Sequence, residues 1–257
     1  MENIEFLKKY QKLQQGIMFD KLIDLKHSIF GFSQLDKTAF WNFALVLRNI
    51  NKNEFSEIEE KIISMNRNLV IYVEDSNEFL GTVELLKSEG YEKLYEDSWM
   101  FWKADEISDE RFGQIKKVES EDDLRVYLET LDNCFQNDDP QGPYGELGDY
   151  LKVAEKVWYE HHDSNRIEYF IAYKGEKPVA VATLTNFENL GYISNVGSLK
   201  EVRGEGFGKL VTLYCVSVSK SRGNGSHFLA TEEGTYPNEF YRRIGFETKF
   251  TGIAYSK

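Results

Sequence analysis

The sequence predicts an α+β fold: a mixed, mostly antiparallel twisted sheet flanked by helices. Short β-branched and aromatic segments alternate with amphipathic segments of helical spacing along most of the chain. In the second half, strands joined by tight turns come first, and a strand–helix–strand crossover follows. The two strands that a crossover helix joins run parallel to each other. Both kinds of strand pairing are therefore expected in one sheet.

Length and composition are those of a folded protein with one large domain or two ordinary ones. The chain has 257 residues, of which 41% are hydrophobic and 14% aromatic, enough to bury a core. No apolar run is long enough to span a membrane, and the first residues mix charges with apolar positions, unlike a secretory signal. Cys134 and Cys215 lie far apart without metal-ligand spacing, which predicts reduced thiols, a cytoplasmic location and no metal.

The charge balance argues against a nucleic-acid partner. The formal net charge is −12 with a pI near 5.0, and basic residues cluster no further than two adjacent pairs. An acidic surface mildly favours a cationic partner or substrate, and it equally serves solubility alone.

The first half of the chain alternates helical and strand patterns. Helical spacing of apolar residues runs through residues 10–25 and continues in 39–50. Residues 68–75 predict a buried strand, followed by a helix that ends at Gly90, where a glycine cap is expected. Alternating aromatics in 95–102 predict a strand.

The second half follows a charged linker at 104–113 and begins with a short strand. Ser120 is expected to cap the next helix, and residues 137–148 concentrate Pro, Gly and Asp and must form a loop. A tight hairpin with Gly175 joins two further strands. The remaining predicted elements are a helix at 150–162, a strand at 189–199, a helix at 208–221, a strand at 227–231, a helix at 238–244 and a strand at 247–256.

The stretch 203–210, RGEGFGKL, places three glycines between a strand and a helix. Bare backbone at a helix start can close on an anion. The glycines fall at every second position, which excludes a G-x-G-x-x-G dinucleotide fingerprint. A Walker A loop is excluded too, because Arg203 occupies the required glycine position and Leu210 follows Lys209. What is left is R-x-x-G-x-G.

This pattern resembles the acyl-CoA pyrophosphate loop of the GNAT family of N-acyltransferases. The stretch 239–247, EFYRRIGFE, resembles the family's second signature, LYxxxGF, with Tyr241 four residues before Gly245. The strand leading into the loop is similar to the family's LxVxPxxRG segment, with Lys200 in place of proline. Together the signatures cover residues 114–257.

The resemblance implies an N-acetyltransferase that uses acetyl-CoA as co-substrate without a metal. Tyr241 would be the general acid that protonates the leaving thiolate, although packing of its helix on the sheet is the alternative role. The general base stays open among Glu232, Glu233 and Asn195. Implied cofactor-binding residues are Val196, Gly197 and Ser198 for the pantetheine arm, and Arg203, Gly204, Glu205, Gly206, Phe207, Gly208 and Lys209 for the pyrophosphate.

The acceptor is expected to be a primary amine of a small molecule or peptide, received by the loop 137–148. Asp138, Asp139 and Glu146 could attract an ammonium group and Tyr144 could wall the pocket, although such loops are acidic for turn reasons alone. Two alternatives stay open: a non-catalytic module that binds acyl-CoA or a protein partner, and transfer of a longer acyl group. A homodimer is possible.

The first half of the chain echoes the second. Aligning Gly90 with Gly245 gives a helix, a glycine, an aromatic residue and an alternating strand in both, with Leu86 at the position of Tyr241. No R-x-x-G-x-G occurs before Arg203. We therefore expect a tandem arrangement, with a GNAT-like domain at 1–106 that lacks the CoA loop and a catalytic domain at 107–257.

Overall fold

The computed structural model describes residues 3–104, 107–139, 141–142 and 144–257, and the chain forms two compact units. Unit 1 consists of Met1–Trp99 and Lys249–Lys257, and unit 2 consists of Met100–Thr248. The predicted domain boundary at 106 lies outside the described residues. The last strand ends in unit 1, so unit 1 consists of two segments of the chain, whereas unit 2 is one continuous segment.

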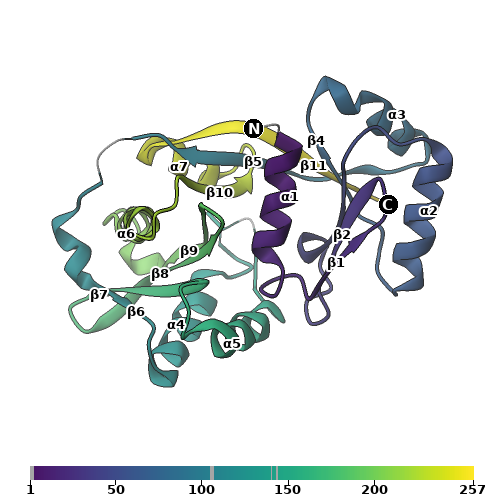
Figure 1. Ribbon diagram of the computed structural model, residues 1–257. Coiled ribbons are helices and arrows are strands. Elements are labelled where there is room, and N and C mark those ends of the chain that lie inside the picture. The colour runs from purple at the N-terminus through teal and green to yellow at the C-terminus, as the bar shows by residue number, and fades with distance from the viewer. Residues whose placement is uncertain (1–2, 105–106, 140, 143) are drawn as a thin grey trace. The chain divides into compact units, whose positions relative to one another are not determined.

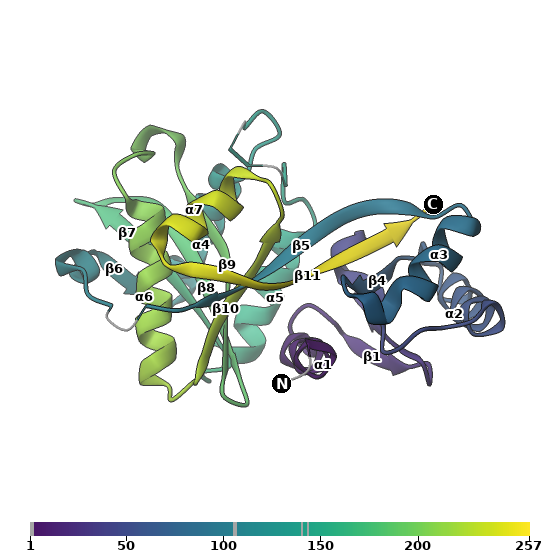
Figure 2. The same cartoon turned by 90° about the horizontal axis from the view of Figure 1, so that it is seen from above.

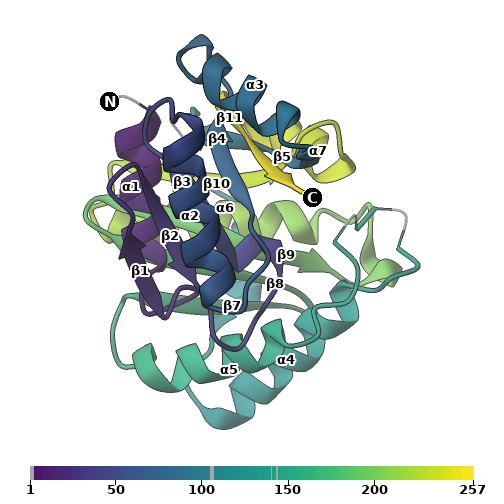
Figure 3. The same cartoon turned by 90° about the vertical axis from the view of Figure 1, so that its right-hand side faces the viewer.

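Unit 1 contains strands in the order β1-β2-β3-β4-β11-β5, with α1 on one face and α2 and α3 on the other (Figures 1 and 3). The pairs β1–β2, β2–β3 and β4–β11 are antiparallel, whereas β3 and β4 pair parallel because the chain crosses over through α2. The elements are α1 (Asn3–Gln14), β1 (Lys21–Asp24), β2 (Ser28–Phe32), β3 (Asn42–Val46), α2 (Lys52–Ser64), β4 (Ile71–Glu74), α3 (Leu80–Ser88), β5 (Glu92–Trp102) and β11 (Phe246–Ser256).

The predicted helical stretches at 10–25 and 39–50 are wrong over most of their length. α1 ends at Gln14, and the chain then turns at Gly16 with a φ of 77° into β1 and β2. All five residues of β3 are buried, so the strand shows no alternation of apolar and polar residues. A strand covered on both faces gives a continuous apolar run, which its pattern alone does not distinguish from a buried helix.

Unit 2 contains the strands β10-β9-β8-β7-β6, with the beginning of β11 and the end of β5 following on beside β10. α4 and α5 cover one face of these strands, and α6 and α7 cover the other (Figures 1 and 2). The elements are β6 (Ile115–Lys117), α4 (Glu121–Cys134), α5 (Tyr150–His161), β7 (Ile167–Lys174), β8 (Lys177–Phe187), β9 (Leu190–Ser198), α6 (Phe207–Ser221), β10 (Ser226–Glu232) and α7 (Tyr236–Ile244).

The predicted α+β class, with mostly antiparallel pairing and a parallel crossover, is confirmed. β6, β7, β8 and β9 pair antiparallel in sequence, and β10 pairs parallel with β9 after the crossover through α6. Local signals also hold: Ser120 Oγ accepts the Asp123 amide at 3.1 Å at the start of α4. Gly90 and Gly245 follow α3 and α7 with φ angles of 82° and 113°, a conformation that favours glycine.

Candidate active site

The strands β9 and β10 separate after a short paired segment. Ser226, His227 and Phe228 pair with residues 190–192, and the described strands show no further pairing between β9 and β10. β9 continues to Ser198 and β10 continues to Glu232. The two strand ends therefore present unpaired backbone edges to each other, and an extended ligand could bind between them.

A β-bulge in β9 accompanies this separation. Val181 lies opposite Gly197 and Thr183 lies opposite Ser194, so β9 has one more residue than β8 across this interval. Asn195 adopts a φ of 53° in the bulge. A bulge of this kind bends its strand, which explains why β9 leaves its parallel partner here.

A buried polar network holds the Asn195 side chain. Its amide donates to Thr183 Oγ1 at 3.0 Å, and its carbonyl oxygen accepts the Tyr150 hydroxyl at 2.8 Å. Thr183 in turn bonds the hydroxyl of Tyr127 at 2.6 Å. Because its amide has these partners, Asn195 positions the bulge, and the structure gives no direct support to the water-holding role considered for it.

The glycine loop has the backbone that its sequence suggests. Gly204 and Gly206 adopt φ angles of 83° and 84°, which side-chain-bearing residues rarely adopt. Gly206 is the N-cap of α6, and no side chain caps the helix. The first amides of α6 therefore lack a side-chain acceptor, and their partial positive charge is available to an anion.

Gly208 and Gly197 are glycines for different reasons. A Cβ on Gly208 would lie 3.6 Å from the Phe240 ring and 3.9 Å from Ser198 Oγ, which is ordinary contact. Neither packing nor φ demands glycine there. A Cβ on Gly197 would lie 2.6 Å from the Cβ of Cys134, so this glycine lets the end of α4 approach β9.

Arg111 was not singled out from the sequence, where it falls in the predicted linker. Its guanidinium donates to the Glu205 carbonyl of the glycine loop at 3.2 Å. Asp109 holds it with two side-chain bonds of 3.0 and 2.8 Å, and this bonding lowers the pKa of Asp109. Only the 3₁₀ turn at Glu110–Gln114 and the folding of the chain bring Arg111 to the loop, and no sequence motif indicates it.

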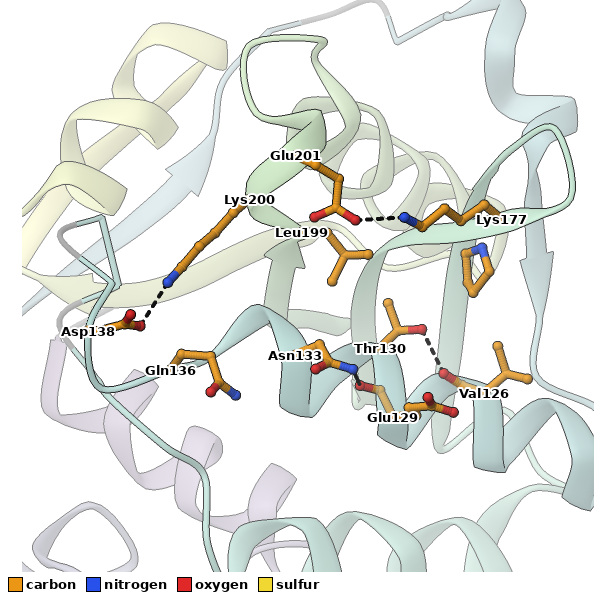
Figure 4. A pocket seen from close by; sticks show the side chains of 11 residues that line it. Val126, Glu129, Thr130, Asn133, Gln136, Asp138, Lys177, Leu199, Lys200 and Glu201 are labelled. Carbon is orange, nitrogen blue, oxygen red and sulfur yellow. Dashed lines mark hydrogen bonds and ion pairs between the residues drawn. The ribbon is translucent and has the colours of Figure 1, made fainter.

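Ion pairs join the loop 137–148 to the glycine loop. Both terminal nitrogens of Arg203 donate to the carboxylate of Asp139, whose pKa is lowered by these bonds. Lys200 Nζ lies 2.7 Å from an oxygen of Asp138 (Figure 4). Asp138 and Asp139, two of the three carboxylates expected to attract an ammonium group, are therefore already paired, which weakens the predicted substrate role of Asp138.

Tyr241 and Tyr144 lie close together at the end of β10. Tyr241 is 9% exposed, and its ring packs edge-on against the ring of Phe246 with 5.8 Å between the ring centres. Burial raises the pKa of Tyr241, and the neighbouring phenol of Tyr144 adds to the rise. The Tyr144 hydroxyl lies 3.2 Å from Thr231 Oγ1 and accepts the Glu232 amide at 3.2 Å. The phenol of Tyr241 consequently stays protonated at neutral pH.

The two glutamates considered as bases differ in their partners. The Glu233 carboxylate accepts from Arg242 at 3.1 Å and from Asn238 at 3.4 Å. The Glu232 carboxylate forms no ion pair within the part of the chain that the structure describes. Of the two, Glu232 has the carboxylate that is available to a ligand.

A separate polar groove of about 580 Å³ lies on the α4 side of unit 2 (Figure 4). Its rim carries the Lys200–Asp138 pair and a pair between Lys177 and Glu201 at 2.7 Å. Its lining consists of Val126, Glu129, Thr130, Asn133, Gln136, Asp138, Lys177, Pro178, Leu199, Lys200 and Glu201. Neither Tyr241 nor the start of α6 contributes to it, so this groove is not the site assembled above.

Over the described ranges, no three His, Cys, Asp or Glu side chains gather where they could hold a metal ion. Among the helices of those same ranges, none combines the length and apolarity needed to cross a bilayer.

Comparisons with known proteins place this geometry in a family. Residues 125–246 match the model of the acetyltransferase (GNAT) family. No curated protein sequence matches the chain. A functionally unknown conserved protein from Staphylococcus epidermidis has a similar structure, with a TM-score of 0.67, 15% identity and 94% of each chain covered.

Two other solved structures are similar over most of the chain. A GCN5-related N-acetyltransferase from Kribbella flavida has a TM-score of 0.66 and 15% identity, covering 96% of this chain and 93% of that one. A tandem GNAT protein from the clavulanic acid biosynthesis pathway has a TM-score of 0.57 and 10% identity, covering 90% and 78%. At these identities the solved structures show a shared fold. The match to the family model is the evidence of relationship: this chain carries a GNAT-family acetyltransferase domain at residues 125–246.

Proposed function

We propose that unit 2 transfers an acetyl group from acetyl-CoA to a primary amine of a small molecule or peptide. One observation supports this most: the uncapped start of α6, with Gly204 and Gly206 before it, follows directly from the strand that separates from β10. An anion-binding helix start beside an open strand edge suits a donor with a pyrophosphate at one end and an extended amide arm at the other.

The donor would bind through backbone and cations together. The amides of residues 203–209 would hold the pyrophosphate, with Arg111 and the exposed Lys209 beside them. The backbone of Val196, Gly197 and Ser198, at the end of β9 that does not pair with β10, would bond the amides of the pantetheine arm. Neither its φ nor the packing around it requires glycine at 208, and a bare backbone there suits the close approach of a phosphate.

The chemical step needs one nucleophile and one proton donor. The amine nitrogen attacks the thioester carbonyl, the new C–N bond forms and the C–S bond breaks. The Tyr241 phenol donates its proton to the departing sulfur, and the proton released by the amine restores the phenol through water. A backbone N–H at the bulge of β9 would stabilise the negative oxygen during the attack. The products are the amide and free CoA.

We take Glu232, in preference to Glu233, as the base that removes the first proton from the protonated amine before the attack; the second proton, released after the C–N bond forms, is the one that restores the Tyr241 phenol. The Glu233 carboxylate is occupied by Arg242 and Asn238, whereas Glu232 lies at the end of β10 with its amide on Tyr144. Tyr144 would then wall the acceptor side of the site, close to Tyr241.

Unit 1 is proposed to be a second copy of the fold without a donor site, so that the chain is a tandem of domains at 1–106 and 107–257. The similar tandem GNAT protein supports this arrangement. The cytoplasmic location and the possible homodimer remain predictions from the sequence.

The test starts from binding, because it needs no acceptor. Thermal unfolding of the full chain is measured with a panel of CoA thioesters of increasing acyl length. Acetyl-CoA should raise the unfolding temperature most, and no shift with any ester would refute the proposal. Release of free thiol with a panel of amines then identifies the acceptor class. Donor binding without thiol release from any amine would favour the non-catalytic module.

A further inference from the structure

One side chain of α5, Tyr150, reaches the bulge of β9 and joins hydrogen bonds that the proposed chemistry does not use. Its hydroxyl donates to Asn195 Oδ1 at 2.8 Å and lies 2.6 Å from Asn195 Nδ2. The Asn195 amide donates to Thr183 Oγ1 on β8, and Thr183 bonds the hydroxyl of Tyr127 on α4. The Asn195 side chain is therefore tied to α5 on one side and to β8 on the other.

The same series of contacts returns to α5 and forms a closed circuit. The Tyr127 ring stacks on the ring of Tyr169 on β7, with 4.4 Å between the ring centres and 8° between the ring planes. The Tyr169 hydroxyl donates at 2.8 Å to the carbonyl of Ala154, about one turn beyond Tyr150 on α5. Tyr127 and Tyr169 are fully buried. The circuit therefore fixes the start of α5 on the strands that form the bulge.

The backbone of the bulge receives little support from the neighbouring strands. Towards β8 the extra residue of β9 interrupts the ladder of hydrogen bonds. Towards β10, the described strand pairs end at Tyr192. Asn195 itself has a φ of 53°, a left-handed conformation that disfavours residues with side chains, although asparagine tolerates it better than most. The side-chain bonds of Asn195 therefore stabilise a backbone that the sheet holds weakly.

We propose that Tyr150 is a positioning residue for the transfer step: by holding the Asn195 side chain, it keeps a backbone N–H of the bulge aimed at the thioester oxygen of the donor. This rests on the proposed function, because the thioester must lie beside the bulge. An oxyanion is stabilised best by donors that already point at it before the reaction begins. Because Tyr150 acts through Asn195 and not through the donor, its hydroxyl should affect the thioester carbonyl more than the donor affinity.

The experiment is infrared spectroscopy of the full chain with acetyl-CoA that carries an isotope label at the thioester carbonyl, and it needs no acceptor. A hydrogen bond to the carbonyl oxygen lowers its stretching frequency, so the band of the bound donor should lie lower in the native protein than in Tyr150→Phe and Asn195→Gly. Glycine at 195 keeps the positive φ and removes only the side chain. Acetyl-CoA affinity should stay within about threefold in both variants, because the lost bonds lie inside the protein. Tyr159→Phe removes an exposed hydroxyl from the same helix and is the matched control.

The outcomes separate this proposal from the one on which it rests. If Tyr150→Phe keeps the native carbonyl band as Tyr159→Phe does, the positioning role is overturned and the transferase proposal stands, whatever the band of Asn195→Gly. Absence of acetyl-CoA binding in the native chain would overturn both. Unfolding midpoints of each variant exclude loss of fold as the cause, since Tyr150 is half-buried and phenylalanine keeps its ring.

Discussion

Two crossovers of the same topology begin their helices in opposite ways. In β3–α2–β4, Asn51 caps α2: its side chain accepts the amides of Asn53 and Glu54 at 3.0 and 3.1 Å. Glu54 completes a capping box by accepting the Asn51 amide at 3.0 Å. In β9–α6–β10, the N-cap is Gly206 and no side chain caps the helix.

The third residue of each helix carries an opposite charge: it is Glu54 in α2 and Lys209 in α6. A carboxylate at a helix start satisfies the partial positive charge from within the protein and repels an incoming anion. Arg48 and His27 bond Glu54 in turn, and the Arg48 bond is the main reason that the pKa of Glu54 falls to about 2. The comparison teaches that the chain's own residues satisfy the start of α2, whereas the start of α6 is left without a side-chain partner.

The helices before the last strand of each half differ in the same sense. α3 and α7 both end at a glycine with positive φ. The residue four places earlier is fully buried Leu86 in α3 and Tyr241 in α7. In unit 1 the crossover helix α2 is therefore capped, and α3 has a leucine where α7 has the phenol.

The largest expected effect comes from removing the hydroxyl group of Tyr241, which unit 1 lacks at the matching position, Leu86. Tyr241→Phe should lower the transfer rate about 100-fold or more, because the thiolate loses its proton donor, and should leave acetyl-CoA affinity unchanged. Steady-state rates and calorimetric affinities measure the two quantities. Tyr214→Phe, a half-buried tyrosine on α6, is the control. An unchanged rate in Tyr241→Phe would assign Tyr241 to packing alone.

Lys209→Glu tests the helix start directly, since it copies Glu54 into α6. Replacing a cation by a carboxylate beside the pyrophosphate should weaken acetyl-CoA binding about tenfold or more. The free energy of unfolding should change by less than about 1 kcal/mol, because an acidic residue suits the first turn. Lys152→Glu in exposed α5 controls for net charge. If Lys209→Glu and Lys152→Glu bound acetyl-CoA equally well, the donor would have to bind away from the start of α6.

Gly208→Ala separates ligand approach from folding. The protein has room for the Cβ and α6 is helical there, so stability should stay the same or rise by up to about 1 kcal/mol. Donor affinity should nevertheless fall severalfold if a phosphate contacts this backbone. Gly206→Ala is the contrasting variant, and it should lose about 1 kcal/mol or more of stability because of its positive φ. Tight binding by Gly208→Ala would show that nothing approaches there.

Asn51→Ala removes the cap in the unit without a donor site. The free energy of unfolding should drop by about 1 kcal/mol, the usual loss for an N-cap. Acetyl-CoA affinity should not change, because α2 takes no part in binding. Chemical denaturation and titration measure the two effects, and a weakened affinity would contradict the division of roles between the helices.

The smallest effect concerns acid stability, where the units should differ in their pH windows. Burial, with a smaller contribution from Lys220, lowers the pKa of His227 in β10 to about 4. The folded state therefore disfavours the proton that the unfolded state binds, and stability is lost as pH falls from about 6.5 toward 4. Glu54 contributes stability that is lost only as pH falls from about 4.5 toward 2. Hydrogen exchange over this range should reveal unit 2 opening at the higher pH, and simultaneous opening would contradict it.

The sequence predicted the parts of unit 2 that rest on local signals. RGEGFGKL and EFYRRIGF mark the helix start and the phenol by spacing, and Ser120 and Gly175 mark a cap and a turn. β3 was not predicted, because a strand buried on both faces shows no alternation of apolar and polar residues.

Contacts between residues far apart in the sequence were the other features that the sequence did not predict. Arg111 reaches Glu205 and Asp139 reaches Arg203 only in the folded chain. The predicted ammonium-binding carboxylates could not be recognised from the sequence as ion-pair partners. Spacing along a chain does not report which charges meet across it.

The central claim is that the chain has one donor site, at the start of α6, although it has two crossovers. Calorimetric titration of the full chain with acetyl-CoA tests it most directly through the stoichiometry, measured on the native protein and on Lys209→Glu. The account predicts one molecule bound per chain, with affinity lowered about tenfold or more in the variant. Two molecules per chain, or one whose binding is indifferent to Lys209→Glu, would contradict it.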